Sequence, residues 1–324
     1  MNKSNILFKA TSLLLVVLAL LSVKGIQAQS NNVVTIKQPT GDVQVKKNPK
    51  RVVVLDLGSL ETCYELGIPV VGVLANVKQF MPEYGDATKY TVAGNVPKAN
   101  IATVAQLKPD LIITSNRQRA QHDSLAMIAP TLLFGTETEN FWSTFEANVR
   151  SIASIFEKEK LAGEKLAALR KKKDLVKAKA KADPKKTVVA MHINGRFNPS
   201  GPNSRFGFAY DVLDLKPAYT PEPAPERESA PQQGEQTQRQ RVQAPSLESI
   251  NPDYLFVFDR ATGIKGEMPV WTDLLNDDVK KTKAYKNNKV FLLPGSIWYL
   301  SGSGLLSVNK KITDIGEKLY GIKF

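Results

Sequence analysis

The stretch Val104-Ala-Gln-Leu-Lys-Pro-Asp-Leu-Ile-Ile-Thr114 joins a short helical pattern, a Pro-Asp break and an apolar strand. The same order returns in Leu247-Glu-Ser-Ile-Asn-Pro-Asp-Tyr-Leu-Phe-Val-Phe258. Proline lacks the N–H that a helix needs and clashes with the preceding turn, so it ends the helix in both copies. A repeat of this kind predicts two similar α/β lobes within one chain.

The sequence before the first copy supports the same fold class. Arg51-Val-Val-Val-Leu-Asp56 is a β-branched strand, and a helix over residues 58–67, with Ser59 as its candidate N-cap, follows it. A second apolar strand covers residues 68–73. This β-α-β unit predicts a parallel sheet, so we expect two Rossmann-like lobes with parallel sheets.

The two lobes are predicted to cover residues 34–140 and 186–324. Between them, apolar residues recur at three- and four-residue steps over residues 141–182. This pattern predicts a long, rigid linking helix, or two helices in series, up to about 60 Å long if unbroken. Its end, residues 170–181, is strongly basic, and we interpret it as a solvated helix end whose cations suit the helix dipole. Residues 220–245 are rich in Gln and Pro and are expected to form a mobile loop in the second lobe.

The N-terminus indicates export. Residues 1–28 combine lysines, an apolar run over residues 13–23 and a small-residue end, a pattern typical of a secretory signal peptide. The run is shorter than the roughly 20 residues that span a bilayer, so a retained anchor is the weaker interpretation. No cysteine directly follows the apolar run, so we expect no lipid attachment. An exported protein without a lipid tether would diffuse away from a cell that has no outer membrane, so we expect a periplasmic location. Cleavage removes three lysines and lowers the formal charge from +13 to +10. Nucleic acid is not an expected partner in that compartment.

The composition excludes several classes of site. One cysteine and two histidines rule out a disulfide framework, a Cys-ligated cluster and a His-rich metal site. No nucleophile elbow, zinc-protease motif or phosphate-binding loop occurs in the sequence. Cys63 lies among apolar residues of a predicted helix, so we expect it to be a packed side chain and not a reactive thiolate. His192 is expected at a core or strand-end position, and His122 is expected in solvent. We therefore expect a binding protein and not an enzyme.

Several spaced motifs occur in the order found in one known family. Ser200-Gly-Pro-Asn-Ser-Arg-Phe-Gly207, residues 251–260 and Trp298-Tyr-Leu-Ser-Gly-Ser-Gly304 resemble the periplasmic binding proteins for ferric catecholate siderophores. Residues 107–118 of the first lobe agree with this resemblance, which runs from about residue 34 to the end of the sequence. It implies a monomer of two lobes joined by a rigid helix, with a shallow ligand cleft between them. It also implies that the ligand passes to an ABC permease in the inner membrane.

The resemblance implies that Arg117, Arg205 and Arg260 converge on the cleft. Arginine stays protonated and presents a planar fork of donors to the anionic oxygens of a ferric catecholate, so it can bind the complex without displacing the chelator. Arg196 is a candidate fourth cation, and Trp298 is a further candidate ligand contact. Iron is expected only inside the siderophore complex, with no resident cofactor.

Some relatives also bind iron directly through one tyrosine and one histidine. The tyrosine matches Tyr299, whose phenolate is a hard donor suited to Fe(III). The alternative is that Tyr299 donates a hydrogen bond to a catechol oxygen. The matching histidine is absent, because no histidine follows His192. Carboxylates that dock on the permease are expected at Glu83 in the first lobe and at Glu222 or Glu226 in the second.

Other ligands remain open on the same scaffold. A haem carrier would need an axial ligand, for which Tyr299 could serve. A cobalamin carrier would not explain three arginines at the cleft. A structural adhesin or sensor built on the same body would lack the converging arginines.

Overall fold

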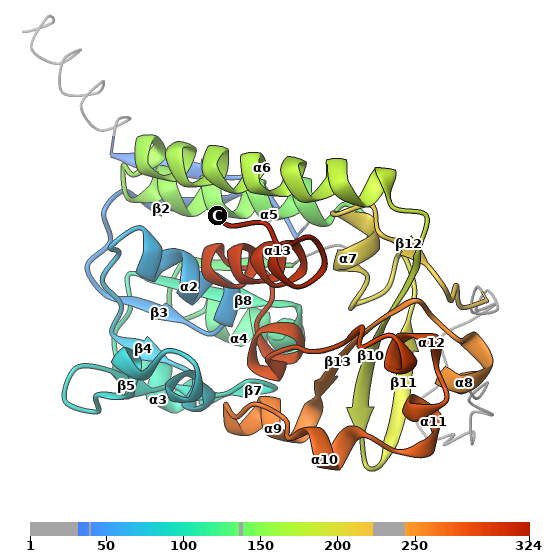
Figure 1. Cartoon of the computed structure of the whole chain (residues 1–324). Helices are drawn as coiled ribbons and strands as arrows, with labels where there is room; N and C mark the ends of the chain where they lie inside the picture. Colours follow the sequence, from blue (N-terminus) through green and yellow to red (C-terminus); the bar gives the residue numbers. More distant parts are fainter. Residues whose placement is uncertain (1–31, 39, 136–138, 223–243) are drawn as a thin grey trace, which may run out of the picture.

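Two α/β lobes lie side by side in the computed structural model, and the long helix α6 runs along both of them (Figure 1). The structure describes residues 32–324, except residue 39, residues 136–138 and residues 223–243. The predicted signal peptide and most of the predicted Gln/Pro-rich loop therefore lie outside the described residues. Among the helices that are described, none has both the length and the apolar composition needed to span a membrane.

The N-terminal lobe is built on a five-stranded parallel sheet with the order β5-β4-β3-β8-β9. Its central strands are buried along their whole length, as expected for a parallel sheet that is covered on both faces. The strands are β3 (Val52–Val54), β4 (Gly72–Val73), β5 (Thr91–Val92), β8 (Leu111–Ser115) and β9 (Thr131–Phe134). The helices and helical turns are α2 (Leu57–Glu65), η1 (Ala75–Gln79), η2 (Pro82–Gly85), α3 (Ile101–Gln106), η3 (Asn116–Gln121) and α4 (His122–Ala126). Two hairpins, β1 (Val33–Ile36) with β2 (Val43–Lys46) and β6 (Gly94–Asn95) with β7 (Lys98–Ala99), complete it.

The C-terminal lobe repeats this plan with one antiparallel edge. Its sheet has the order β11-β10-β13-β14, with β12 also paired to β10, and only the β10–β11 pairing is antiparallel. The strands are β10 (Lys186–Ile193), β11 (Arg196–Ser200), β12 (Lys216–Pro217), β13 (Tyr254–Asp259) and β14 (Val290–Leu292). The helices and turns are α7 (Phe208–Asp211), α8 (Leu247–Ile250), α9 (Arg260–Lys265), α10 (Trp271–Leu274), α11 (Asp277–Lys280), α12 (Lys283–Lys286), η4 (Ser296–Leu300) and α13 (Leu305–Tyr320). The prediction of two α/β lobes with largely parallel sheets is confirmed.

The repeated helix–Pro-Asp–strand pattern has the same structure in both lobes, since α3 leads to β8 and α8 leads to β13. The aspartate of each copy has the same role. Asp110 accepts the backbone N–H of Arg51 at 3.0 Å, and Asp253 accepts that of Lys186 at 2.9 Å. Each bond ties the start of one strand to the start of its parallel neighbour. The repeat therefore specifies strand pairing as well as a helix end.

The start of α2 differs from the prediction. Its N-cap is Asp56, whose carboxylate accepts the Ser59 N–H at 2.8 Å. Ser59 is not the cap, because Asp56 is the last residue with extended backbone and its side chain faces the free N–H groups of the first turn. The Ser59 hydroxyl donates a second hydrogen bond to the same carboxylate. A carboxylate is thereby placed at the carboxyl edge of the first sheet.

The expected linking helix is two helices, α5 (Phe141–Ile155) and α6 (Glu159–Ala182). The chain reverses between them at Glu157, which has left-handed backbone with φ of 54°. The helices are antiparallel, because Glu146 of α5 forms an ion pair with Arg170 of α6. Of the two predicted forms, one unbroken helix of about 60 Å over residues 141–182 is wrong, and two successive helices are confirmed, although they fold back on each other. α6 alone, about 36 Å long, forms the link.

α6 is fixed to each lobe by an ion pair. Lys165 bonds Glu65 at the end of α2, and Lys177 pairs with Asp214 of the C-terminal lobe at 3.2 Å. The basic end of α6 is thus partly used to hold the second lobe. This supports a structural role for those charges.

The last helix crosses between the lobes. α13 packs against α6 and against α2 of the N-terminal lobe, as Figure 1 shows. The predicted boundary, with all of residues 186–324 in one lobe, is therefore not followed at the end of the chain. The amphipathic pattern of α13 predicts a buried face but does not identify the lobe that covers it.

Candidate functional site

Three arginines meet on one short segment at the junction of the lobes. Arg117 donates to the Leu300 carbonyl oxygen at 3.4 Å, and Arg205 donates to the Tyr299 carbonyl oxygen at 2.7 Å. Arg260 donates from Nε to the Tyr299 hydroxyl at 2.8 Å. The structure therefore brings together the three arginines and the tyrosine that the motifs single out. One comes from the N-terminal lobe and two come from the C-terminal lobe.

Local structure places each guanidinium. Arg117 is the second residue of η3, which follows β8 directly and begins with a capping box formed by Ser115 and Gln118. Arg260 is the first residue of α9, directly after β13. Arg205 lies in the Gly/Pro-rich loop before α7, which Asp211 holds by accepting the Asn203 N–H. Two of the three arginines therefore lie at carboxyl ends of parallel strands, where α/β folds bind ligands.

Tyr299 is surrounded by positive charge. The guanidinium carbons of Arg205 and Arg260 lie 4.8 Å and 5.4 Å from its ring centroid. Burial alone would raise the pKa of Tyr299, but the Arg260 hydrogen bond and the charges of Arg260, Arg205 and Arg117 outweigh it and lower the pKa. Burial and the nearby Arg117 in turn lower the pKa of Arg205. An anionic ligand would relieve this repulsion between cations.

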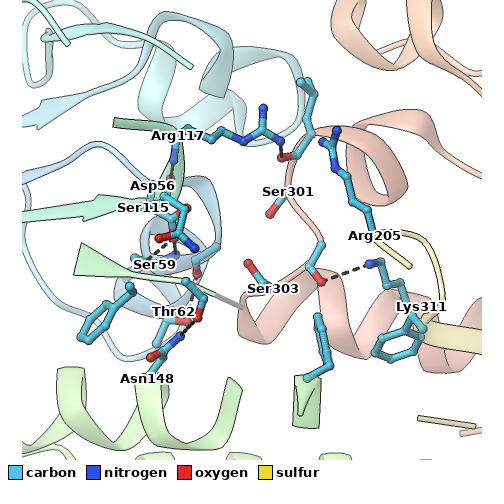
Figure 2. Close-up of a pocket in the computed structure, with 18 of the residues that line it drawn as sticks. Asp56, Ser59, Thr62, Ser115, Arg117, Asn148, Arg205, Ser301, Ser303 and Lys311 are labelled. Carbon is cyan, nitrogen blue, oxygen red and sulfur yellow. Dashed lines mark hydrogen bonds between the residues drawn. The ribbon is translucent and has the colours of Figure 1, made fainter. Parts of the chain in front are cut away.

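A cavity of about 230 Å³ extends inward from Arg117 and Arg205, whereas Arg260 is not among its lining residues (Figure 2). Its wall is formed by both lobes, by α5 and by the chain after η4. Figure 2 shows Arg117 and Arg205 on one side, Lys311 further along and the loop carrying Ser301 and Ser303 between them. We call the part lined by Lys311, Trp298, Phe208 and Ser303 the inner chamber.

Two carboxylates, the half-buried Asp56 and the fully buried Glu61, lie beside the cavity and were not predicted from the sequence. Asp56 lines the cavity, and burial raises its pKa against the opposing hydrogen bonds from Ser59. Burial also raises the pKa of Glu61 to about 7. Glu61 accepts hydrogen bonds from the Ser301 hydroxyl and from the Ser307 N–H, so it joins α2 to the first turn of α13. Asp56 could have been identified from the sequence, since it ends a predicted parallel strand and α/β folds bind ligands at the carboxyl ends of such strands.

Lys311 is a third missed residue, and it is only 4% exposed. Its Nζ donates to the Gly302 carbonyl oxygen at 3.1 Å. Lys311 could also have been identified from the sequence, because Val308, Ile312 and Ile315 form the buried face of the same helix. A lysine on an apolar helix face is unusual and indicates either a specific partner or a cavity.

Two of the predicted ligand residues, Trp298 and Arg196, lie outside the arginine cluster. Trp298 lines the cavity but is 2% exposed, so it belongs to the inner wall rather than to an open cleft surface. Arg196 is exposed at the start of β11, beside the hairpin turn at Gly195. It does not line the cavity. Arg196 is therefore not brought together with the other three arginines.

The remaining candidates lie on the surface or at structural positions. Glu83 and Glu222 are exposed, and Glu226 lies outside the described residues. His192 donates a 2.8 Å hydrogen bond from Nδ1 to the Asp259 carboxylate at the ends of β10 and β13, which agrees with its predicted strand-end position. His122 is half-buried and not in solvent, because its ring packs where η3 meets α4.

The family follows from a match over most of the described chain. The periplasmic binding protein family matches residues 52–297, a range that contains both five-stranded sheets and the start of η4. This chain belongs to that family. Its members are binding proteins, so the expectation that the protein is not an enzyme is confirmed. The one cysteine agrees with this, because burial raises the pKa of the Cys63 thiol to about 12, as expected for a packed side chain and not for a reactive thiolate.

Three similar proteins show how this binding protein relates to others. The petrobactin-binding protein YclQ of Bacillus subtilis is 35% identical over 279 residues, 85% of this chain and 84% of its own length. Its crystal structure has a TM-score of 0.77 and covers 89% of this chain and 99% of that one. The ferric-anguibactin-binding protein FatB of Vibrio anguillarum is 28% identical over 87% of this chain and 86% of its own. The catecholate-siderophore-binding protein VctP of Vibrio cholerae is 25% identical, with a TM-score of 0.75, covering 87% and 99%.

Proposed function

We propose that this binding protein captures a ferric catecholate siderophore between its lobes and delivers it to an ABC permease of the inner membrane. The observation that carries the proposal is the convergence of Arg117, Arg205 and Arg260 on Tyr299 and Leu300. The similarity to the petrobactin-binding protein YclQ, the ferric-anguibactin-binding protein FatB and the catecholate-siderophore-binding protein VctP supports it.

The chemistry of the cluster fits an anion that arrives with its metal already chelated. Each guanidinium keeps its charge and offers several N–H donors in one plane. Each of the three now bonds a carbonyl or hydroxyl oxygen of residues 299–300, so anionic catechol oxygens would replace weaker neutral acceptors. The ligand would also reduce the repulsion that lowers the pKa of Arg205.

The partners and the compartment follow from the same proposal. The protein works as a monomer in the periplasm, without a lipid anchor. Glu83 and Glu222 are the candidate carboxylates for docking on the permease, one in each lobe, and both are exposed.

The first experiment measures ligand binding directly. Purified protein should bind a ferric tris- or bis-catecholate with a dissociation constant below about 1 μM, visible as quenching of tryptophan fluorescence. Trp298 gives the expected signal, because it lines the cavity beside the arginines. Saturable binding of haemin without quenching by any ferric catecholate would instead support a haem carrier.

Direct contact between Tyr299 and iron is the second proposal about this site. The lowered pKa of Tyr299 favours the phenolate that Fe(III) prefers. With a ferric bis-catecholate, Tyr299→Phe should change the position and intensity of the ligand-to-metal charge-transfer band, because one oxygen donor is lost. Tyr285→Phe, at an exposed tyrosine of the same lobe, is the control and should leave the band unchanged. If Tyr299→Phe also leaves it unchanged, the tyrosine contacts the chelator and not the metal.

A further inference from the structure

The inner chamber contains a buried cation, Lys311, in addition to the arginine cluster. Lys311 enters it from α13, and its Nζ donates the hydrogen bond to the Gly302 carbonyl oxygen that is drawn as a dashed line from Lys311 in Figure 2. Lys311, Arg117 and Arg205 line one continuous cavity. A group bound at the arginines could therefore extend toward Lys311 without leaving the protein.

The aromatic rings around Lys311 attract a positive charge, but the ammonium group is incompletely hydrogen-bonded. Its Nζ lies 5.1 Å from the ring centroids of Trp298 and Phe208 and 5.8 Å from that of Phe141. Aromatic faces attract an ammonium group through their quadrupole. The one hydrogen bond recorded for Nζ goes to the Gly302 carbonyl, which leaves two of its three N–H donors for another acceptor.

The nearest carboxylates are already engaged. Both oxygens of Glu61 accept hydrogen bonds from Ser301 and Ser307, and Asp56 accepts two from Ser59. Neither forms an ion pair with Lys311, and no other carboxylate in the described part of the chain does. The buried cation is therefore not neutralised by direct contact. Burial lowers the pKa of Lys311 to about 7, as expected for such a group.

A second donor in the wall has no partner. The indole Nε1 of Trp298 is buried and makes no hydrogen bond with any described residue. Buried donors in native proteins are nearly always bonded, so an unbonded one beside a cavity indicates a ligand or water acceptor. The Ser303 hydroxyl lines the same cavity.

We propose that the inner chamber binds a carboxylate group, held by the ammonium of Lys311. A carboxylate suits the site because its single charge matches the single chamber cation, whereas a dianion would face Asp56 across the cavity. The aromatic walls suit the short carbon chain that carries it. The whole cavity, of about 230 Å³, is many times larger than the roughly 10–15 Å³ needed to hold one water molecule, so it has room for a carboxylate with a short chain.

The carboxylate has two sources that the experiment separates. It is either a free small carboxylate or an uncoordinated carboxylate arm of the siderophore. Only the second source rests on the proposed function.

The first arm uses sodium acetate and a protein in which Trp298 is the single tryptophan. Trp142→Phe and Trp271→Phe create this background. Acetate should change the Trp298 fluorescence saturably, and Lys311→Met should weaken this binding at least about tenfold. Methionine keeps most of the lysine's length without its charge, and an uncharged replacement of a buried ion is often tolerated. Lys310→Met, at the half-exposed neighbour on the same helix, is the matched control and should have no effect.

The second arm compares two ferric bis-catecholates that differ only in one free carboxylate. The unaltered protein should bind the carboxylate-bearing chelate at least about fivefold more tightly, and Lys311→Met should abolish this preference while both chelates still bind. A Lys311-dependent effect in the first arm alone identifies a free carboxylate, and one in the second arm alone identifies a siderophore arm.

A third measurement needs no variant. A crystal of the unaltered protein soaked in 3-bromopropionate should show a bromine anomalous peak in the inner chamber. The proposal is overturned if no such peak lies there and neither arm shows dependence on Lys311. If acetate binds through Lys311 but no ferric catecholate binds at all, the chamber site stands and the proposed function fails.

Discussion

Arg205→Ala should weaken the binding of a ferric catecholate at least about tenfold, a loss of about 1.4 kcal/mol or more in binding free energy. Arg205 donates to the Tyr299 carbonyl at 2.7 Å and stacks on the Tyr299 ring at 4.8 Å. It is thus the arginine in closest contact with the segment where the other two meet. Its removal takes away both a charge-assisted donor and the cation that fixes the tyrosine ring. Titration of tryptophan fluorescence with one ferric catecholate measures the change.

The control for this prediction is Arg196→Ala. Arg196 is an exposed arginine of the same lobe that does not line the cavity, and its removal should change affinity less than about twofold. Thermal unfolding should be nearly the same for both variants, because neither arginine is buried in the core. Equal affinities for the unaltered protein and Arg205→Ala would place the ligand away from the arginine cluster.

The sequence predicts the parts of this fold that depend on local chemistry. The repeated Pro-Asp break marks a helix end and a strand start in each lobe because proline and a buried apolar run act within a few residues. The three arginines could be identified for the same reason, since two of them directly follow apolar strands. Their meeting on Tyr299 and Leu300 could not be read from periodicity, because it depends on how the lobes are joined.

The errors arise where distant segments decide the structure. The chain reverses at Glu157 because α5 and α6 can then bury apolar faces against each other and the lobes. The periodicity of apolar residues alone is equally consistent with one straight helix. Lys311 was not predicted from the sequence because its burial beside the cavity depends on the packing of α13, and α13 returns to the N-terminal lobe.

The packing of α13 on α2 gives the second large expected effect, in Gly304→Ala. Gly304 precedes α13 and contacts α2 so closely that an added Cβ would overlap the Gly58 carbonyl oxygen and the Glu61 carboxylate. Its φ of −103° suits any residue, so the cost would come from overlap and not from backbone strain. Overpacking of a closed site costs about 1–3 kcal/mol, and displacement of Glu61 would also weaken its bond to Ser307. We expect a loss of about 3 kcal/mol in the free energy of unfolding, measured by urea denaturation.

Gly163→Ala is the matched control, because it adds the same methyl group inside α6 where no atom lies within 4 Å. It should raise the free energy of unfolding by about 0.5–1 kcal/mol, since alanine restricts the unfolded chain and favours the helix. Opposite signs for the two substitutions would show that the α2–α13 contact is tightly closed. If Gly304→Ala were as stable as Gly163→Ala, α13 would have room to move on α2. The loop that carries the Leu300 carbonyl to Arg117 would then be free to shift with it.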